Sequence, residues 1–259
     1  MSTHADRVRV RLSRLFRDIP QPSPIDVHPK IYERVSDARA YFLRGFSEAL
    51  KVPPEALPQL LQVMPFQGRG FAIEGMAMAL TLMDELSPVP HSRLCVLFDG
   101  RSAEEQTLVA IGVGWASARL GKSLDWTPTA LGSHYMSAVV DGYGFHQGFF
   151  HSERFTGRGF PMNTGELSTF YDIGLGRALW FVHIGRVEPI VHTIDRFLPA
   201  RRKQLWRGVG TACAFTGNAT LAATQMSEAA GNFESHFSAG LETGTQLLCT
   251  LAQQTEEIL

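Results

Sequence analysis

Hydrophobic residues along this chain recur at the spacing of amphipathic helices. Between residues 187 and 198, for example, apolar side chains stand at positions i, i+3, i+4, i+7 and i+10, which places them in one stripe. The same spacing, with proline and glycine breaks, predicts helices over residues 37–50, 53–63, 71–86, 104–120, 129–150, 166–183, 187–198, 201–216, 219–230 and 234–257. The best candidate for a strand, residues 94–98, stands alone. The pattern therefore predicts an all-α fold.

Gly-x-Gly triplets interrupt these apolar helices at regular intervals. Their first glycines are residues 68, 112, 142, 174 and 208, with a degenerate sixth triplet at 240, so the intervals are 44, 30, 32, 34 and 32 residues. A glycine inside a helix costs about 1 kcal/mol relative to alanine. Repeated pairs therefore predict helices whose backbones approach one another very closely.

The regular interval indicates a repeated unit in which a Gly-x-Gly helix is followed by a second helix. Residues 168–198 contain the clearest example, and residues 205–230 repeat the order. The period and the glycine near the middle of the first helix resemble tetratricopeptide repeats. We expect a stack of helical hairpins, either a tetratricopeptide-like α-solenoid or a compact α-bundle, in one domain over residues 31–259. Residues 1–30, rich in arginine and proline, are expected to form a flexible arm.

Composition and charge exclude several classes of function. The chain has 259 residues, a formal net charge of -1 and a hydrophobic fraction of 44%. It therefore offers a large core and no basic face for a nucleic acid. No apolar stretch reaches the length of about 20 residues that a transmembrane helix needs. The three cysteines lie far apart and indicate no disulfide framework, which fits a cytoplasmic protein.

The sequence contains no motif that indicates a cofactor or a metal. Phosphate-binding loops, the nucleophile elbow and the His-Glu-x-x-His pair are missing, and no Gly-x-Gly triplet has the third glycine of a dinucleotide site. The nine histidines form no ligand pair with nearby carboxylates. We therefore expect no cofactor and no metal, so that any chemistry comes from side chains alone.

Three segments of the chain resemble one protein family. They are residues 69–80 (RGFAIEGMAMAL), 141–150 (DGYGFHQGFF) and 171–181 (YDIGLGRALWF). Through them, the chain from about residue 31 onward resembles the domain-of-unknown-function 1702 family. Members of that family stand in bacterial natural-product gene clusters, notably those for enediynes, beside an iterative polyketide synthase. The resemblance implies a role in maturing a lipophilic polyene or polyketide intermediate, with the synthase or another pathway protein as a partner.

His146 breaks a rule that the other repeats follow. Two residues after the second glycine of the other triplets stand Ala72, Ala116, Ala178 and Ala212. Small residues suit a tight helix crossing. An imidazole at this position therefore either faces a cavity or fills an enlarged gap as a hydrogen-bonded core histidine.

Two carboxylates stand close to the triplets. Glu74 lies four residues after Gly70 and is flanked by apolar side chains. If it is buried, its pKa should rise unless Arg69, Arg177 or His146 lies near, and a structural ion pair is the alternative to a catalytic role. Asp141, directly before the 142–144 triplet, is either an acid or base or the N-cap of that helix.

Arg177 is the cation that connects these candidates. Its spacing allows a cation–π contact with Trp180 or Phe181, while its guanidinium meets Glu74, Asp141 or Asp172. We expect a substrate pocket lined by this arginine and by aromatic rings. The predicted lining residues are Tyr143, Phe145, Phe149, Phe150, Arg177, Trp180 and Trp206.

Two functions are compatible with these residues. In the first, Asp141, His146 or Glu74 shuttles a proton to or from a polyene in a cofactor-independent isomerisation or cyclisation. In the second, the protein is a non-catalytic helical-repeat scaffold that binds a synthase, a carrier protein or a reactive product.

Overall fold

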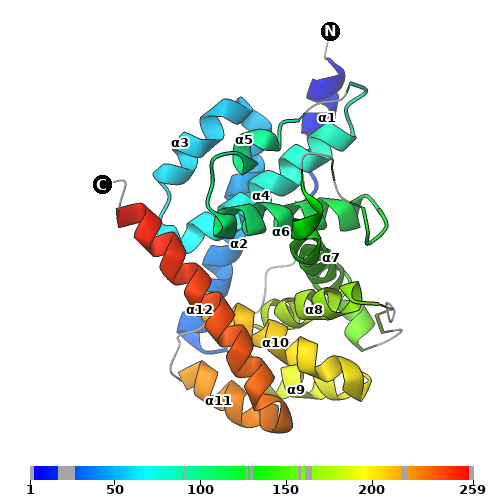
Figure 1. Ribbon diagram of the computed structural model, residues 1–259, viewed down its shortest axis with the longest axis vertical. Coiled ribbons are helices and arrows are strands. Elements are labelled where there is room, and N and C mark those ends of the chain that lie inside the picture. Colours follow the sequence, from blue (N-terminus) through cyan, green and yellow to red (C-terminus); the bar gives the residue numbers. More distant parts are fainter. Residues whose placement is uncertain are drawn as a thin grey trace. The chain divides into compact units, whose positions relative to one another are not determined.

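Helices make up the regular structure of the chain (Figure 1). The structure, a computed structural model, describes residues 3–16, 27–89, 92–126, 128, 131–156, 159–160, 165–216 and 221–256. The α-helices are α1 His4–Leu12, α2 Pro29–Lys51, α3 Leu57–Gln62, α4 Phe66–Glu85, α5 Cys95–Phe98, α6 Ala103–Arg119, α7 Met136–Phe150, α8 Leu167–His183, α9 Val187–Asp195, α10 Pro199–Thr216, α11 Leu221–Ala230 and α12 Glu234–Glu256. Short 3₁₀ helices occupy Pro54–Ala56, Ser133–Tyr135, Ser152–Phe155 and Gly231–Phe233. The described residues contain no strand, so the predicted all-α fold is confirmed.

Two segments behave differently from their sequence pattern. The apolar run 94–98, the best strand candidate, forms the short helix α5. Within the segment expected to be an arm, Thr3 and Asp6 cap α1 reciprocally, and the buried Leu12 anchors its end. Residues 1–2 and 17–26 of that arm lie outside the described residues, and its last two residues begin α2. No helix in the described ranges combines the length and the apolar character required to cross a bilayer.

The chain divides into two compact units. The first consists of residues 1–21, 38–139 and 251–259, and the second of residues 22–37 and 140–250. Helices α2, α7 and α12 therefore contribute residues to both units. The single domain proposed for residues 31–259 stays a prediction.

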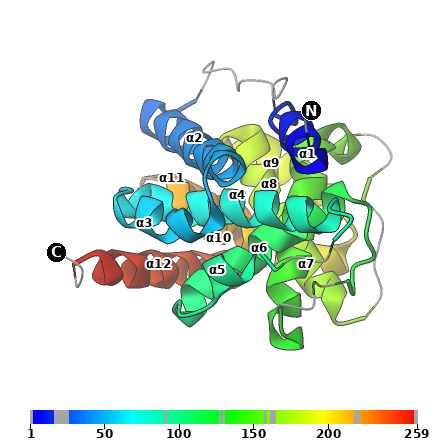
Figure 2. The same cartoon turned by 90° about the horizontal axis from the view of Figure 1, so that it is seen from above.

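Helix α4 is the centre of the first unit. Nearly every residue from Gly68 to Met83 is buried, because this segment is apolar on all sides rather than on one face. It packs against α6, and the two helices run side by side in Figure 2. Helix α6 is buried in turn from Leu108 to Ala118.

Successive helix crossings form the second unit. Helices α8 and α10 lie side by side, with α9 and α11 packed against α10 (Figure 1). The predicted stripe on α9 faces inward, since Ile190 and Ile194 are buried. Helix α8 ends at Ile184 and Gly185, which both have positive φ.

Where α7 crosses α8, α8 crosses α10 and α10 crosses α12, a glycine of one helix lies against a backbone carbonyl of the other, and the contact is reciprocal. Between α7 and α8, Gly144 lies against the carbonyl of Tyr171, and Gly174 lies against the carbonyl of Asp141. A Cβ at either glycine would overlap that carbonyl oxygen. The same arrangement joins Gly176 to Leu205, Gly208 to Ile173, Gly210 to Phe237 and Gly240 to Arg207. The close approach predicted from the Gly-x-Gly triplets is confirmed here.

The two glycines of a triplet contact different neighbouring helices. In α8, Gly174 contacts α7 and Gly176 contacts α10. Helix α12 lacks the second glycine of a triplet, because two residues after Gly240 stands the exposed Glu242; its other glycine, Gly244, also lies against α10. The triplets of α8 and α10 thus mark helices that are crossed on both sides.

The first unit has the same kind of helix crossing, but in α4 the contact positions are not the glycines of the 68–70 triplet. Gly75 of α4 lies against the carbonyl of Phe42 in α2, and Gly112 of α6 lies against the carbonyl of Glu74. A Cβ on Gly112 would also come within 2.7 Å of the Cβ of Ala77. Gly75 and Ala77 therefore hold the two crossing positions of α4.

The prediction that the 68–70 triplet begins the repeat is wrong. Gly68 lies against the ring of Tyr41, and a Cβ on Gly70 would meet only leucine side chains, the nearest at 3.4 Å. For both glycines the nearest atoms belong to side chains and not to the backbone of another helix. With Gly75 as the first position, the interval to Gly112 is 37 residues (112 minus 75) instead of 44, which is closer to the others.

Candidate functional site

Most of the predicted site residues lie in the second unit. Helix α7 carries six of them and α8 two, while α10 carries Trp206; the full set is Asp141, Tyr143, Phe145, His146, Phe149, Phe150, Arg177, Trp180 and Trp206. Glu74 lies on α4 in the first unit. The arrangement of the α7 and α8 residues follows from the glycine crossing between these helices.

Asp141 and Arg177 form an ion pair across that crossing. The backbone carbonyl of Asp141 lies against Gly174, so its side chain reaches Arg177, three residues further along α8. Asp141 Oδ1 and Arg177 Nη1 are 2.6 Å apart, and their side chains are 16% and 7% exposed. Of the three predicted partners of Arg177, the structure thus places Asp141 against it. Asp141 is not an N-cap, because α7 begins at Met136 and Asp141 lies within the helix.

Burial raises the pKa of the Asp141 carboxyl above its ordinary value, although the charge and the hydrogen bond of Arg177 act in the opposite direction. Loss of solvent destabilises the ionised form of a carboxyl group. Asp141 therefore retains its proton to a higher pH than an exposed aspartate does. This is the property that a general acid needs.

Aromatic rings lie on the Arg177 side of the Asp141–Arg177 pair. The Arg177 guanidinium lies 5.1 Å from the centre of the Phe145 ring, so the predicted cation–π contact is made with α7 rather than along α8. Phe145 also packs edge to face on Phe181 at 5.3 Å and stacks on Phe149 at 5.9 Å. The pair therefore sits on an aromatic surface built from both helices.

His146 is 2% exposed and belongs to the same helix face as Phe150, with ring centres 4.6 Å apart. In the corrected repeat frame its equivalents are Ala79, Ala116, Ala178 and Ala212, so it remains the exception. The burial predicted from that exception is confirmed.

The two tryptophans and the tyrosine differ in their surroundings. Trp180 is fully buried, and its Nε1 donates to Thr216 Oγ1 at 2.6 Å, so it ties α8 to α10 in the core. Trp206 packs edge to face on Phe237 at 6.4 Å. Tyr143 is half-buried, 6.3 Å from the Tyr171 ring, and burial raises the pKa of its phenol.

Glu74 and Asp141 occupy the same position of the repeat. Each supplies the backbone carbonyl that lies against the first glycine of the next Gly-x-Gly helix, Gly112 for Glu74 and Gly174 for Asp141. Glu74 is 4% exposed. Arg69, one of its predicted cations, donates instead to the carbonyls of Leu61 and Gln62. The equivalence was hidden in the sequence because the frame of the first repeat was set at Gly68.

Sequence reasoning also missed a second buried ion pair. Nε of Arg201 donates to both carboxylate oxygens of Asp172 at 3.1 and 3.0 Å, and its Nη2 donates to Oδ1 at 2.6 Å. Its Nη1 donates to the Phe160 carbonyl at 3.0 Å. The pair joins α8 to the start of α10 and leaves few free hydrogen-bonding sites, which makes it a structural contact.

Among the described residues, no group of three or more His, Cys, Asp and Glu side chains is placed to hold a metal ion.

Comparison with known proteins identifies a family. Neither the curated proteins nor the solved structures contain a match to the chain. A family model described as "protein of unknown function (DUF1702)" matches residues 25–253. Since this match covers most of the chain, the protein belongs to the DUF1702 family.

Proposed function

We propose that this protein acts in the cytoplasm in the biosynthesis of a bacterial natural product, on a lipophilic polyene or polyketide intermediate such as an enediyne precursor. Asp141 is its general acid in a cofactor-independent isomerisation or cyclisation. The observation that carries the proposal is a largely buried carboxyl group with a raised pKa, paired with Arg177, whose guanidinium lies over the Phe145 ring. Family membership supports the biosynthetic setting.

The chemistry follows from what these groups can do. A protonated Asp141 gives its proton to a carbon–carbon double bond, and the positive charge that develops on the substrate is stabilised by aromatic faces. The carboxylate left behind is stabilised by the Arg177 guanidinium at 2.6 Å. This carboxylate or His146 then removes a proton from a neighbouring substrate carbon. The substrate is neutral again, its double bond has moved, and the isomerisation is complete.

The test is complementation of a gene deletion in the producing bacterium, with product measured by mass spectrometry. Asp141→Asn keeps the shape of the side chain and removes the transferable proton. We expect it to lower product by about 100-fold or more, as is usual for loss of a general acid. Circular dichroism of the purified variant checks that the helices remain.

Asp84→Asn is the matched control. Asp84 pairs with Arg93 at 2.6 Å, and its side chain is 14% exposed, close to the 16% of Asp141. This variant should keep product within about twofold, because its carboxylate has no proposed role in proton transfer. Full product from folded Asp141→Asn, His146→Phe and Glu74→Gln variants would overturn the enzymatic proposal. The non-catalytic alternative would then be tested by binding to the synthase and to its carrier protein.

A further inference from the structure

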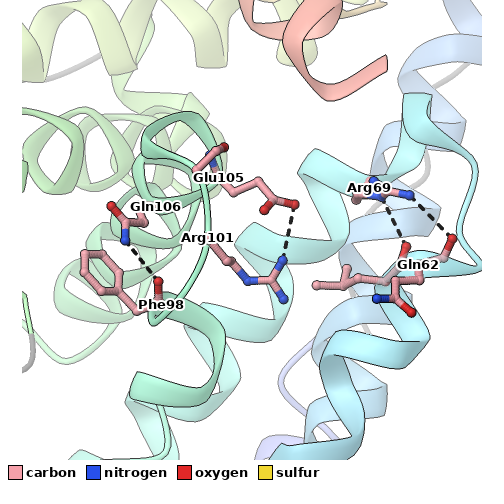
Figure 3. Close-up of polar contacts among 8 residues, drawn as sticks. Gln62, Arg69, Phe98, Arg101, Glu105 and Gln106 are labelled. Atoms are coloured by element: carbon pink, nitrogen blue, oxygen red, sulfur yellow. Dashed lines mark hydrogen bonds and ion pairs between the residues drawn. The ribbon is translucent and has the colours of Figure 1, made fainter. Parts of the chain in front are cut away.

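A cavity of about 510 Å³ lies in the first unit, between the end of α3, the start of α4 and the segment that joins α5 to α6. Figure 3 shows Arg69 and Arg101 on opposite sides of this region. The apolar part of its wall comes from Pro58, Leu61 and Val96. A volume of this size is typical of sites for small organic molecules.

Arg69 carries a buried positive charge without a carboxylate beside it. The residue is 3% exposed, its Nε donates to the Leu61 carbonyl at 3.1 Å, and its Nη2 donates to the Gln62 carbonyl at 3.4 Å. Within the described ranges these two carbonyls are its only hydrogen-bond partners, and no acidic side chain pairs with it. Carbonyl groups supply partial charges only, whereas a buried ion is normally paired with a full opposite charge. The cavity beside Arg69 is therefore suited to an anion.

Arg101 is the second cationic side chain of the cavity wall. Its Nη1 lies 3.2 Å from Glu105 Oε1, and the two side chains are 12% and 11% exposed. Its Nε is buried and has no hydrogen-bond partner in the part of the chain that the structure describes. Because this Nε is closed to solvent, a ligand in the cavity would meet Arg101 through the exposed part of its side chain, beside Glu105.

The charges of the wall define the class of ligand. Arg101 and Glu105 balance each other, and the exposed Asp99 brings the sum over the four charged lining residues to zero, so Arg69 is the buried cation that has no carboxylate beside it. Asp99 lies at the exposed edge of the cavity and opposes a multiply charged anion. We propose that the cavity binds an organic carboxylic acid, with its carboxylate on Arg69 and Arg101 and its hydrocarbon part against Leu61 and Val96. This site is independent of the chemistry proposed at Asp141.

Isothermal titration calorimetry of the full chain tests the proposal with three probes: sodium octanoate, 1-octanol and inorganic phosphate. We expect saturable binding of octanoate to one site and no binding of octanol or phosphate. Arg69→Met should weaken octanoate binding by about tenfold or more, because it removes the charged donor. Arg119→Met, which removes an exposed arginine at the end of α6, is the matched control and should bind as the wild type does.

Val96→Trp is a second variant that keeps both arginines and fills the apolar side of the cavity. It should abolish octanoate binding, and it provides the test if Arg69→Met fails to fold. Absence of octanoate binding to the wild type would overturn the proposal. So would equal affinities of the wild type and a folded Arg69→Met variant, or binding of phosphate in place of octanoate.

Discussion

Arg201 in the second unit and Arg69 in the first are both buried, at 9% and 3% exposed, but they meet different partners. Arg201 makes three hydrogen bonds to the Asp172 carboxylate, and Arg177 in the same unit pairs with Asp141. Arg69 meets two backbone carbonyls. The charge of Arg201 is therefore balanced by a carboxylate of the protein itself. The charge of Arg69 is not, and we propose that a ligand balances it. The helix crossings, by contrast, follow one rule in both units.

The largest expected effect comes from breaking the balanced pair. Arg201→Met leaves Asp172 buried without its cation, and burial already raises the pKa of that carboxyl. We expect a loss of about 3–5 kcal/mol in the free energy of unfolding, measured by urea denaturation at pH 7. The neighbouring Arg202→Met is the control, because its partner Asp195 is 63% exposed, and it should cost less than about 1 kcal/mol.

The next effect tests the feature that the units share. Gly208→Ala places a Cβ against the Ile173 carbonyl and 2.8 Å from the backbone nitrogen of Arg177. Neither backbone atom can move without shifting α8. We expect a loss of about 3 kcal/mol in the free energy of unfolding. Gly70→Ala is the matched helical control, because its Cβ would lie 3.4 Å from a leucine side chain. That variant should be neutral or more stable by up to about 1 kcal/mol. Equal losses at the two positions would contradict the corrected repeat frame.

The pH dependence of the stability tests whether the second unit disfavours a buried cation that has no carboxylate partner. Burial, with a smaller effect from the charge of Arg186, lowers the pKa of His183 from 6.5 to about 4. The unfolded chain therefore binds the proton more readily. The neutral ring stabilises the fold fully above pH 6.5, and this stability is lost as the pH falls through about 4.

His183→Gln should remove that part of the pH dependence. We expect the wild type to lose about 2 kcal/mol between pH 6.5 and 4 that the variant does not lose, measured by urea denaturation at each pH. Identical slopes for the wild type and the variant over this range would show that His183 is not held neutral by the fold.

The smallest effect is expected at Arg69 itself. Without ligand, Arg69→Met removes a guanidinium that has no carboxylate to leave behind. Removal of the buried charge stabilises the fold, and loss of the two hydrogen bonds to carbonyls destabilises it. These two contributions to the free energy of unfolding nearly cancel. The free energy of unfolding should change by less than about 1 kcal/mol. A loss as large as that of Arg201→Met would show that the fold depends on Arg69 in the same way and would remove the contrast between the units.

Sequence patterns predicted most of the helices because their apolar spacing and their breaks are local properties. Segment 166–183, for example, forms α8 over Leu167–His183. The frame of the first repeat was not predictable in this way. Helix α4 contains Gly68, Gly70 and Gly75, and the second crossing position is Ala77, so spacing alone favours the wrong triplet.

The candidate site was predictable in its residues but not in its contacts. Arg177 had three possible carboxylate partners in the sequence. The choice of Asp141 depends on which carbonyl lies against Gly174, a property of two helices far apart in the chain. The pair formed by Asp172 and Arg201 depends in the same way on the crossing of α8 and α10, and no local pattern indicates it.

The carbonyl-on-glycine contact has a mechanical consequence for the second unit. A helix displaced by one residue along its neighbour would bring a carbonyl onto a side chain, such as that of Leu175 between Gly174 and Gly176. Because α8 and α10 are held at two such points, they can neither slide nor roll against each other without separating. The α8–α10 pair is therefore a rigid element within the second unit. Any partner that binds this pair would meet a preformed surface.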